Sequence, residues 1–166
     1  ISIKWIPDNL FVQPEFKDNW LLYYTGITRV AKNILTEIVR GMFLNDGHCL
    51  GILDAIKQHA NTLSDAIQRS DYSLTGKMIA RSWKLNNSLD SGTSTAEIQQ
   101  IVRAVKDYCL GFKLLGAGGG GYMLFAAKDP GAAAKVHHIL STYPPNSKAR
   151  FVKMNVSNRG FQVSRS

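Results

Sequence analysis

The chain has 166 residues, of which 45% are hydrophobic, and its formal net charge is +8. This length fits one domain, and the hydrophobic content suffices for a core, which excludes an intrinsically disordered chain. The sequence has no run of about 18 apolar residues, which excludes a membrane-spanning helix.

The first segments read as strands. Residues 1–6 alternate as a strand does, and because the chain starts there without a methionine, we expect a fragment of a longer protein. Residues 20–24 form a continuous apolar run, which predicts a buried strand that ends at Thr25-Gly26. Cys49 and Cys109 form no metal-binding pattern, so we predict no metal site and a reducing, cytoplasmic location.

A helix is predicted after this strand. Thr28 can cap it, Gly41 can end it, and its apolar positions recur every four residues, at Val30, Ile34, Ile38 and Met42. The turn from Thr25 to Arg29 then combines unpaired helix N–H groups with a cation, an arrangement that attracts anions. The alternative is an ordinary capped helix with a solvated Arg29.

Three more helices are predicted in the middle of the chain. The first two span about 50–69 and 74–87, and a polar loop over 86–93 follows. Ser94 and Glu97 have the spacing of a capping box for the third helix. We expect Gly111 to end that helix, whose apolar face comprises Ile98, Ile101, Val102, Val105 and Cys109.

The most informative stretch is a glycine-rich loop between two predicted strands, 112–115 and 122–127. Its residues are Gly116, Ala117, Gly118, Gly119, Gly120 and Gly121. Such a backbone tolerates positive φ and close approach, and its N–H groups can form a concave nest for a phosphate. The alternative is a tight hairpin in which glycine only relieves steric strain.

Three known phosphate-binding loops do not fit this stretch. The dinucleotide fingerprint requires a helix after the loop, whereas a strand is predicted here. Walker A requires Lys and then Ser or Thr after the second glycine, whereas Tyr122 follows Gly121. The protein-kinase loop is accompanied by V-A-I-K, H-R-D and D-F-G, which do not occur downstream.

The remaining residues complete an α+β pattern. Asp129-Pro130 starts a helix that faces inward through Val136, Ile139 and Leu140 and stops at 143–146. A strand follows over 150–156, and after a turn at 158–160 residues 161–163 can pair as an edge. The order matches the ferredoxin-like βαββαβ arrangement with additional helices. We expect the helices to cover one sheet face and the extra ones to extend that layer.

After Asp129 the chain has no acidic residue, while lysines and arginines continue to its end. This segment can be a solvated face, a surface for nucleic acid or an acidic partner, or a contribution to polyphosphate binding. Composition alone does not separate these interpretations.

The glycine stretch with its preceding strand, Lys113–Gly121, resembles the third conserved motif of the GHMP small-molecule kinases. Leu22–Arg29 resembles the corresponding stretch of the sugar kinases in that family, which include heptose 7-phosphate kinases and L-fucokinases. Trp83–Asn86 and Leu89–Gly92 are more similar to the fucokinase branch. The resemblance extends from about Trp20 to Val163.

The resemblance implies a single C-terminal GHMP kinase domain over residues 1–166, and phosphoryl transfer from ATP, with Mg²⁺, to a sugar hydroxyl. It implies nucleotide binding at Gly116–Gly121 and substrate contacts at Thr25, Gly26 and Arg29. The family's phosphate-loop motif P-x-x-x-G-L-G-S-S-A and its catalytic acid belong to an N-terminal half that this sequence lacks. We therefore assign no catalytic or metal-binding residue here and expect the chain alone to be inactive.

Two interpretations from other functional classes remain. One is a ferredoxin-like RNA-binding module, which the glycines disfavour because RNA-binding sheets display stacking aromatic residues. The other is a regulatory domain that binds a small molecule without chemistry. Within the kinase interpretation, L-fucose is the favoured substrate and heptose 7-phosphate is the alternative.

Overall fold

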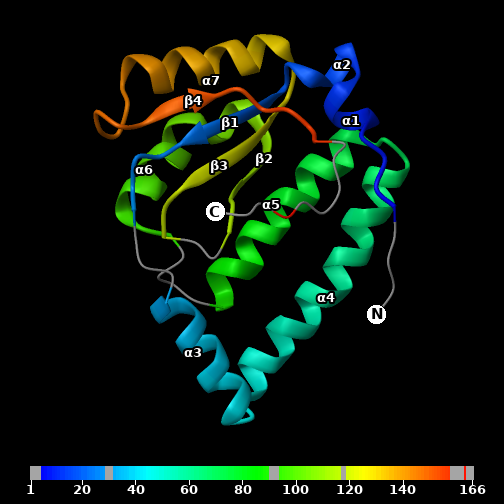
Figure 1. Cartoon of the computed structure of the whole chain (residues 1–166), viewed down its shortest axis with the longest axis vertical. Coiled ribbons are helices and arrows are strands. Elements are labelled where there is room, and N and C mark those ends of the chain that lie inside the picture. Colours follow the sequence, from blue (N-terminus) through cyan, green and yellow to red (C-terminus); the bar gives the residue numbers. More distant parts are fainter. Residues whose placement is uncertain (1–4, 29–31, 90–93, 117–118, 158–162, 164–166) are drawn as a thin grey trace.

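The computed structural model of the chain describes residues 5–28, 32–89, 94–116, 119–157 and 163 (Figure 1). The strands are β1 (Trp20–Tyr24), β2 (Cys109–Leu114), β3 (Tyr122–Ala127) and β4 (Arg150–Val152). The helices are α1 (Asn9–Val12), α2 (Pro14–Lys17), α3 (Lys32–Phe43), α4 (Gly47–Gln68), α5 (Tyr72–Leu89), α6 (Ala96–Val105) and α7 (Pro130–Thr142), with a short 3₁₀ turn at Lys106–Tyr108.

The four strands form one antiparallel sheet in the order β2-β3-β1-β4. Strand β1 is central, and it pairs with β3 from Trp20↔Ala126 to Tyr24↔Tyr122 and with β4 from Leu22↔Val152 to Tyr24↔Arg150. Strands β1 and β2 are both antiparallel to the β3 that lies between them. This is the ferredoxin-like topology, so the α+β prediction is confirmed.

Helices α6 and α7 pack on one face of the sheet. Tyr23, Met123 and Phe125 point to this side from β1 and β3, and all three are fully buried. The helices contribute Ile98, Ile101, Val102, Val105, Val136 and Leu140 to the same cluster. This cluster is the main core, because it holds most of the large buried side chains.

Helix α5, backed by α4, packs against the opposite face beside β2 (Figure 1). The approach is close at two glycines: a Cβ on Gly111 would lie 1.9 Å from the carbonyl oxygen of Gly76, and one on Gly76 would lie 2.7 Å from the Cβ of Leu110. The expectation that all helices extend one layer is therefore wrong. Residues with side chains at these two positions would keep α5 away from β2. The pattern of apolar residues along each helix does not reveal such a contact, so it did not indicate the second layer.

Several predicted boundaries agree with the structure. Strand β1 has the predicted bounds, and so does β3, Tyr122–Ala127. Helix α7 begins after Asp129, whose carboxylate accepts a hydrogen bond from the Ala132 N–H at 2.7 Å, and it carries Pro at its first position. The capping chemistry that predicted this start therefore forms as expected.

Other boundaries differ. Thr95, not Ser94, caps α6, because the Thr95 hydroxyl accepts the Ile98 N–H at 3.3 Å. Gly111 lies inside β2 and does not end a helix. Helix α3 continues past Gly41, where a Cβ would lie 2.8 Å from the Cys49 sulfur, and it ends at Phe43, shortly before Asn45 with its φ of +51°. Helix α4 starts earlier than predicted, because Asp46 caps it.

The two ends of the chain are only partly described. Trp5 and Ile6 form no strand, and residues 1–4 lie outside the described residues. Strand β4 is shorter than the predicted 150–156, and the predicted turn and edge pairing at 158–163 fall outside the described residues except for Val163, which is in no strand. Over the described part of the chain, no helix has the length and apolar content needed to cross a membrane.

Candidate functional site

The glycine loop connects β2 to β3, as the sequence predicted. Gly116, Gly119 and Gly121 have φ of +80°, +77° and +90°, the left-handed region that residues with a side chain rarely adopt. Ala117 and Gly118 lie outside the described residues. The glycines are thus required by the backbone at three of the four described loop positions.

The loop is docked onto the segment that follows β1. The Gly121 N–H donates to the Ile27 carbonyl at 3.0 Å, and the Thr25 N–H donates to the Gly121 carbonyl at 2.9 Å. A Cβ on Gly120 would lie 2.3 Å from the Ile27 carbonyl oxygen, so only glycine permits this approach. A hairpin that merely relieved strain would not need a bare backbone at that contact. The structure therefore argues against the tight-hairpin alternative.

We call the contact between Gly120–Gly121 and Thr25–Ile27 the glycine junction, and Thr25 makes several of its hydrogen bonds. Its side chain is fully buried, and its hydroxyl donates to the Gly121 carbonyl at 2.9 Å while accepting the Ile27 N–H at 3.3 Å. The sequence predicted that Thr25 lies near the loop, and it does. Because the side chain has no exposed surface, it positions the loop and offers no group to a ligand in this conformation.

A third segment joins the junction through Asn146, in the turn after α7. The Asn146 amide donates to the Thr25 carbonyl at 2.8 Å, and its oxygen accepts the N–H groups of Lys148 and Ala149 at 3.0 and 3.1 Å. Gly26 has φ of +70°, and a Cβ there would lie 2.0 Å from the Asn146 oxygen. The sequence analysis treated Asn146 only as part of a helix stop; its position after two prolines was the available signal of a turn.

In the described residues of the glycine junction, backbone N–H groups are the polar groups that could interact with an anion. One loop N–H, that of Gly121, is engaged with Ile27 and is unavailable to a ligand. The predicted cation, Arg29, lies outside the described residues, and so does the helix start that Thr28 was expected to cap. The described part of the loop thus places left-handed glycines beside the end of β1.

A lysine lies on the α5 side of the sheet, before the loop. Burial lowers the pKa of the Lys113 ammonium, because desolvation disfavours its charged form. In the orientation in which both the oxygen and the nitrogen of the Asn86 amide form hydrogen bonds, the oxygen accepts from the Lys113 Nζ at 2.7 Å. The nitrogen then donates to the Ser82 carbonyl at 3.3 Å. Residues of the motif and of α5 are therefore linked by a direct polar contact.

The described residues do not offer a set of magnesium ligands. Among them, no three His, Cys, Asp or Glu side chains gather where a metal ion could be held. Mg²⁺ is normally bound by carboxylates together with phosphate oxygens and water.

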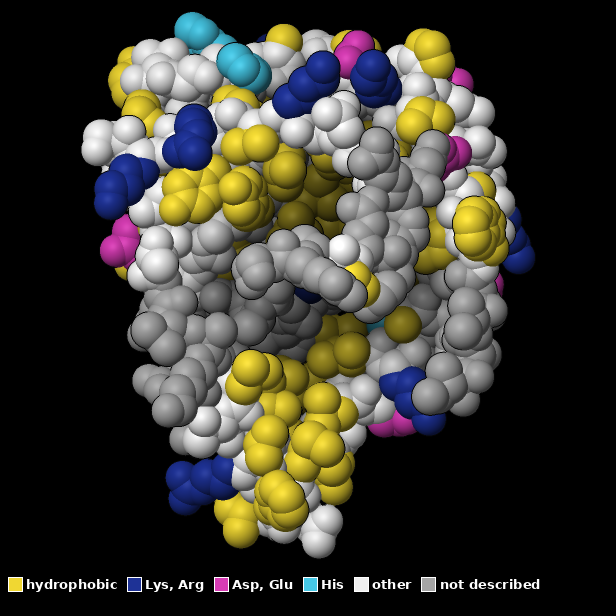
Figure 2. All heavy atoms as spheres, viewed as in Figure 1, with side chains coloured by type: hydrophobic (Ala, Val, Ile, Leu, Met, Phe, Trp, Pro, Cys, Tyr) yellow, Lys and Arg dark blue, Asp and Glu magenta, His cyan; other side chains and the backbone are white. Residues whose placement is uncertain are grey.

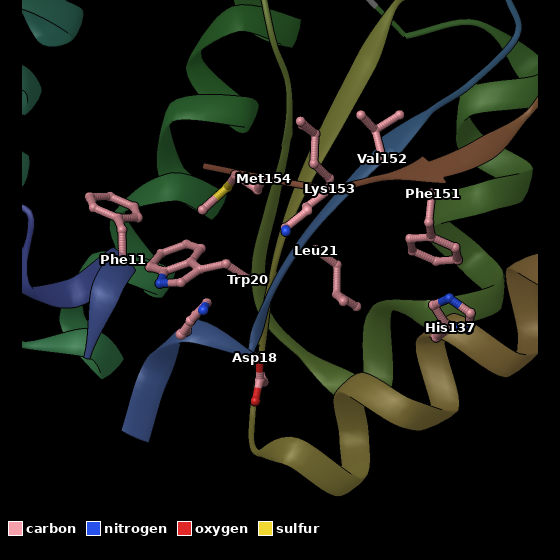
Figure 3. A pocket seen from close by; sticks show the side chains of 11 residues that line it. Phe11, Asp18, Trp20, Leu21, His137, Phe151, Val152, Lys153 and Met154 are labelled. Atoms are coloured by element: carbon pink, nitrogen blue, oxygen red, sulfur yellow. The ribbon is translucent and has the colours of Figure 1, made fainter. Parts of the chain in front are cut away.

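A separate cavity of about 450 Å³ lies at the other end of β1 (Figure 3). Trp20 forms part of its wall, and the Trp20 indole donates to the Leu10 carbonyl at 2.7 Å, which ties α1 to the sheet. On the far wall, His137 stacks on Phe151 with ring centroids 4.4 Å apart. Because β1 extends from Trp20 to Tyr24 between the two places, this cavity is distinct from the glycine junction.

Comparison with known proteins agrees with the fold and the motif. Residues 63–146 match the family described as GHMP kinases C terminal. The chain is 51% identical to the L-fucokinase/L-fucose-1-P guanylyltransferase of Bacteroides fragilis over 99% of its own length and 17% of that protein. It is 32% identical to the D-glycero-alpha-D-manno-heptose 7-phosphate kinase of Campylobacter jejuni, over 69% of its length and 34% of that protein.

Among solved structures, the mevalonate kinase of Methanococcus jannaschii has a similar fold. The TM-score is 0.66 at 18% sequence identity, and the match covers 93% of this chain and 44% of that protein. At this identity the likeness concerns the fold alone. The chain spans less than half of the length of each of these three proteins.

Proposed function

Because this chain belongs to the GHMP kinases and covers their C-terminal domain, we propose that it is the C-terminal half of an ATP-dependent sugar kinase. The enzyme transfers the γ-phosphoryl group of ATP to a sugar hydroxyl. L-Fucose, giving L-fucose 1-phosphate, is the favoured acceptor, since the 51% identity is to an L-fucokinase over nearly the whole chain. The weaker similarity to a heptose 7-phosphate kinase makes that sugar the second candidate.

The observation that carries the proposal is the docked glycine loop. Gly121 is bonded to Thr25 and Ile27, so the β3 end of the loop is held in one place relative to the end of β1. Phosphoryl transfer depends on positioning and on stabilising charge, and we propose that the anchored Gly121 positions the preceding loop residues for this role. A loop that moved freely would provide neither.

We assign the site residues on this basis. Gly116 to Gly121 approach the nucleotide phosphates, Thr25 and Gly26 hold the loop and the adjoining turn beside the substrate, and Arg29 contacts the substrate. Residues 1–166 act as one domain. No residue of this chain is assigned as catalytic base.

The proposal places the remaining chemistry outside this chain. An N-terminal kinase domain of the same protein supplies the main phosphate loop, the Mg²⁺ ligands and the catalytic acidic residue. ATP and Mg²⁺ are the cofactors, and the bound metal neutralises charge on the transferred phosphoryl group. The relatives that are longer than this chain support such a partner.

The test uses the complete gene product. Purified protein is incubated with Mg-ATP and, separately, with L-fucose, heptose 7-phosphate, galactose or mevalonate, while ADP release is followed. We expect turnover with L-fucose, and with residues 1–166 alone we expect none. Turnover with heptose 7-phosphate alone would keep the kinase and change the sugar, whereas no ADP release with any acceptor would contradict the proposal and favour a regulatory domain.

The variant Gly120→Ala tests whether the kinase activity depends on the glycine loop. The substitution places a Cβ against the Ile27 carbonyl, so sugar-dependent ADP release should fall by at least about tenfold. Gly51→Ala is the matched control, since a Cβ there meets nothing within 4 Å. Equal activity of the two variants would separate the loop from catalysis.

A further inference from the structure

One sheet face is partly exposed at the end near the glycine loop, at Tyr122. Helix α5 covers the part of this face near Gly111 and Ala126. Toward the glycine loop, the same face carries Tyr24 and Tyr122 on paired positions of β1 and β3. Figure 2 views the molecule from this side and shows hydrophobic side chains on the wall of a hollow over the sheet.

The two tyrosines and one arginine form an ordered row across three strands. Tyr24 pairs with Tyr122 on one side and with Arg150 on the other. The two tyrosine rings have centroids 5.2 Å apart at an angle of 48°, and the Arg150 guanidinium lies 5.0 Å over the ring of Tyr24. Arg150 and Tyr24 thus support each other, and Tyr122 packs on the other side of Tyr24.

Exposure separates Tyr122 from the other aromatic residues of the sheet. Its side chain is 41% exposed, whereas Tyr23 is fully buried and Trp20 is 4% exposed. A large aromatic ring that is exposed but fixed by a neighbouring ring is suited to ligand contact, because little conformational entropy is lost when the ligand binds.

The position next to the loop limits what that ligand can be. Tyr122 directly follows Gly121, and Tyr24 directly precedes Thr25, so the row borders the docked junction. A group stacked on Tyr122 therefore lies next to whatever phosphate the loop contacts. In ATP the base is separated from the terminal phosphate by the ribose and two further phosphates, whereas the acceptor sugar is adjacent to the transferred phosphoryl group.

We propose that Tyr122 packs against the apolar face of the acceptor sugar ring, with Tyr24 as a positioning residue held by Arg150. This inference rests on the proposed sugar-kinase function, and it names Tyr122 as a residue that helps to select a sugar as the acceptor. The C–H side of a pyranose is apolar and matches an aromatic face, while the tyrosine hydroxyl can bond with the sugar hydroxyls. Loss of the ring should therefore weaken sugar binding without affecting the nucleotide.

The experiment measures KM for sugar, KM for ATP and kcat in the complete gene product with Tyr122→Leu and Tyr122→Phe. For Tyr122→Leu we expect KM for the sugar to rise about tenfold with KM for ATP unchanged within about twofold. Tyr122→Phe keeps the ring and should stay within about threefold of the parent protein. Tyr143→Leu is the control, because Tyr143 is 78% exposed at the end of α7.

The outcomes separate this inference from the proposed function. Sugar-dependent ADP release by the parent protein supports the kinase whatever the variants do. If Tyr122→Leu then raises KM for ATP instead, the ring contacts the nucleotide and the inference is wrong. If it leaves both KM values unchanged, or if Tyr122→Phe is as impaired as Tyr122→Leu, aromatic packing on the sugar is also excluded. A thermal unfolding curve for each variant verifies that it is folded.

Discussion

Gly120→Ala should destabilise the chain as well as reduce activity, and the size of the effect follows from the loop contacts. The added Cβ would lie 2.3 Å from the Ile27 carbonyl oxygen and 2.9 Å from its carbon. Both are backbone atoms, so a side-chain rotation cannot relieve the clash. The loop must move away from Ile27 until the atoms reach ordinary van der Waals contact.

That movement breaks the hydrogen bonds that dock the loop. They are the Gly121 N–H to the Ile27 carbonyl, and the Thr25 N–H and hydroxyl to the Gly121 carbonyl. At about 1 kcal/mol net for each bond, the loss is about 2–3 kcal/mol, a large part of the roughly 5–15 kcal/mol that stabilises a typical domain.

Urea denaturation followed by circular dichroism measures this loss. Gly51→Ala is the control in the same experiment, because Gly51 is exposed inside α4 and a Cβ there meets nothing within 4 Å. It should gain about 0.5–1 kcal/mol through helix propensity. The reasoning is refuted if Gly120→Ala loses less than about 0.5 kcal/mol, since the loop would then have another position of equal free energy.

Three further predictions concern buried polar groups. Thr25→Val should lower the free energy of unfolding by about 1–2 kcal/mol, because it removes a buried hydroxyl that bonds to Gly121 and Ile27, and Thr25→Ser should recover most of it in the same urea assay. Burial, with smaller effects of nearby cations, lowers the pKa of His59 in the folded chain. Because the unfolded chain binds this proton more readily, the free energy of unfolding should fall as the pH drops below about 6.5, by at most about 1.4 kcal/mol per pH unit. His59→Leu should flatten this pH dependence in urea titrations at pH 7.5 and 5.5. Burial raises the pKa of Cys109 to about 12, so iodoacetamide at pH 8 should label it only after unfolding, and rapid labelling of the native chain, seen by peptide mass spectrometry, would contradict the burial.

The sequence was most informative where local chemistry determines the structure. The apolar run of β1 and the Asp129-Pro130 start of α7 appear with their predicted bounds or cap. The glycine loop also lies between strands as predicted. These features depend on neighbouring residues only, so a pattern within a few positions was enough.

The sequence patterns did not predict features that depend on contacts between residues far apart in the chain. Gly111 was taken as a helix end, but it is glycine because α5 approaches β2 there. The burial of Thr25 follows from the docking of Gly121, nearly a hundred positions later, and no local pattern indicates it. Asn146 lies in a turn that the two preceding prolines indicate, but its bond to the Thr25 carbonyl, more than a hundred positions earlier, has no signature in the local sequence.

The central position of β1 has a consequence for how the chain becomes ordered during synthesis. This strand leaves the ribosome before its partners, which are β3 and then β4, beginning at Arg150. Until those partners emerge, an apolar run from Trp20 to Tyr24 remains unpaired, while α4 and α5 can associate as sequence neighbours. Folding is therefore limited by long-range strand pairing, and ribosome-bound intermediates expose a segment that general chaperones recognise.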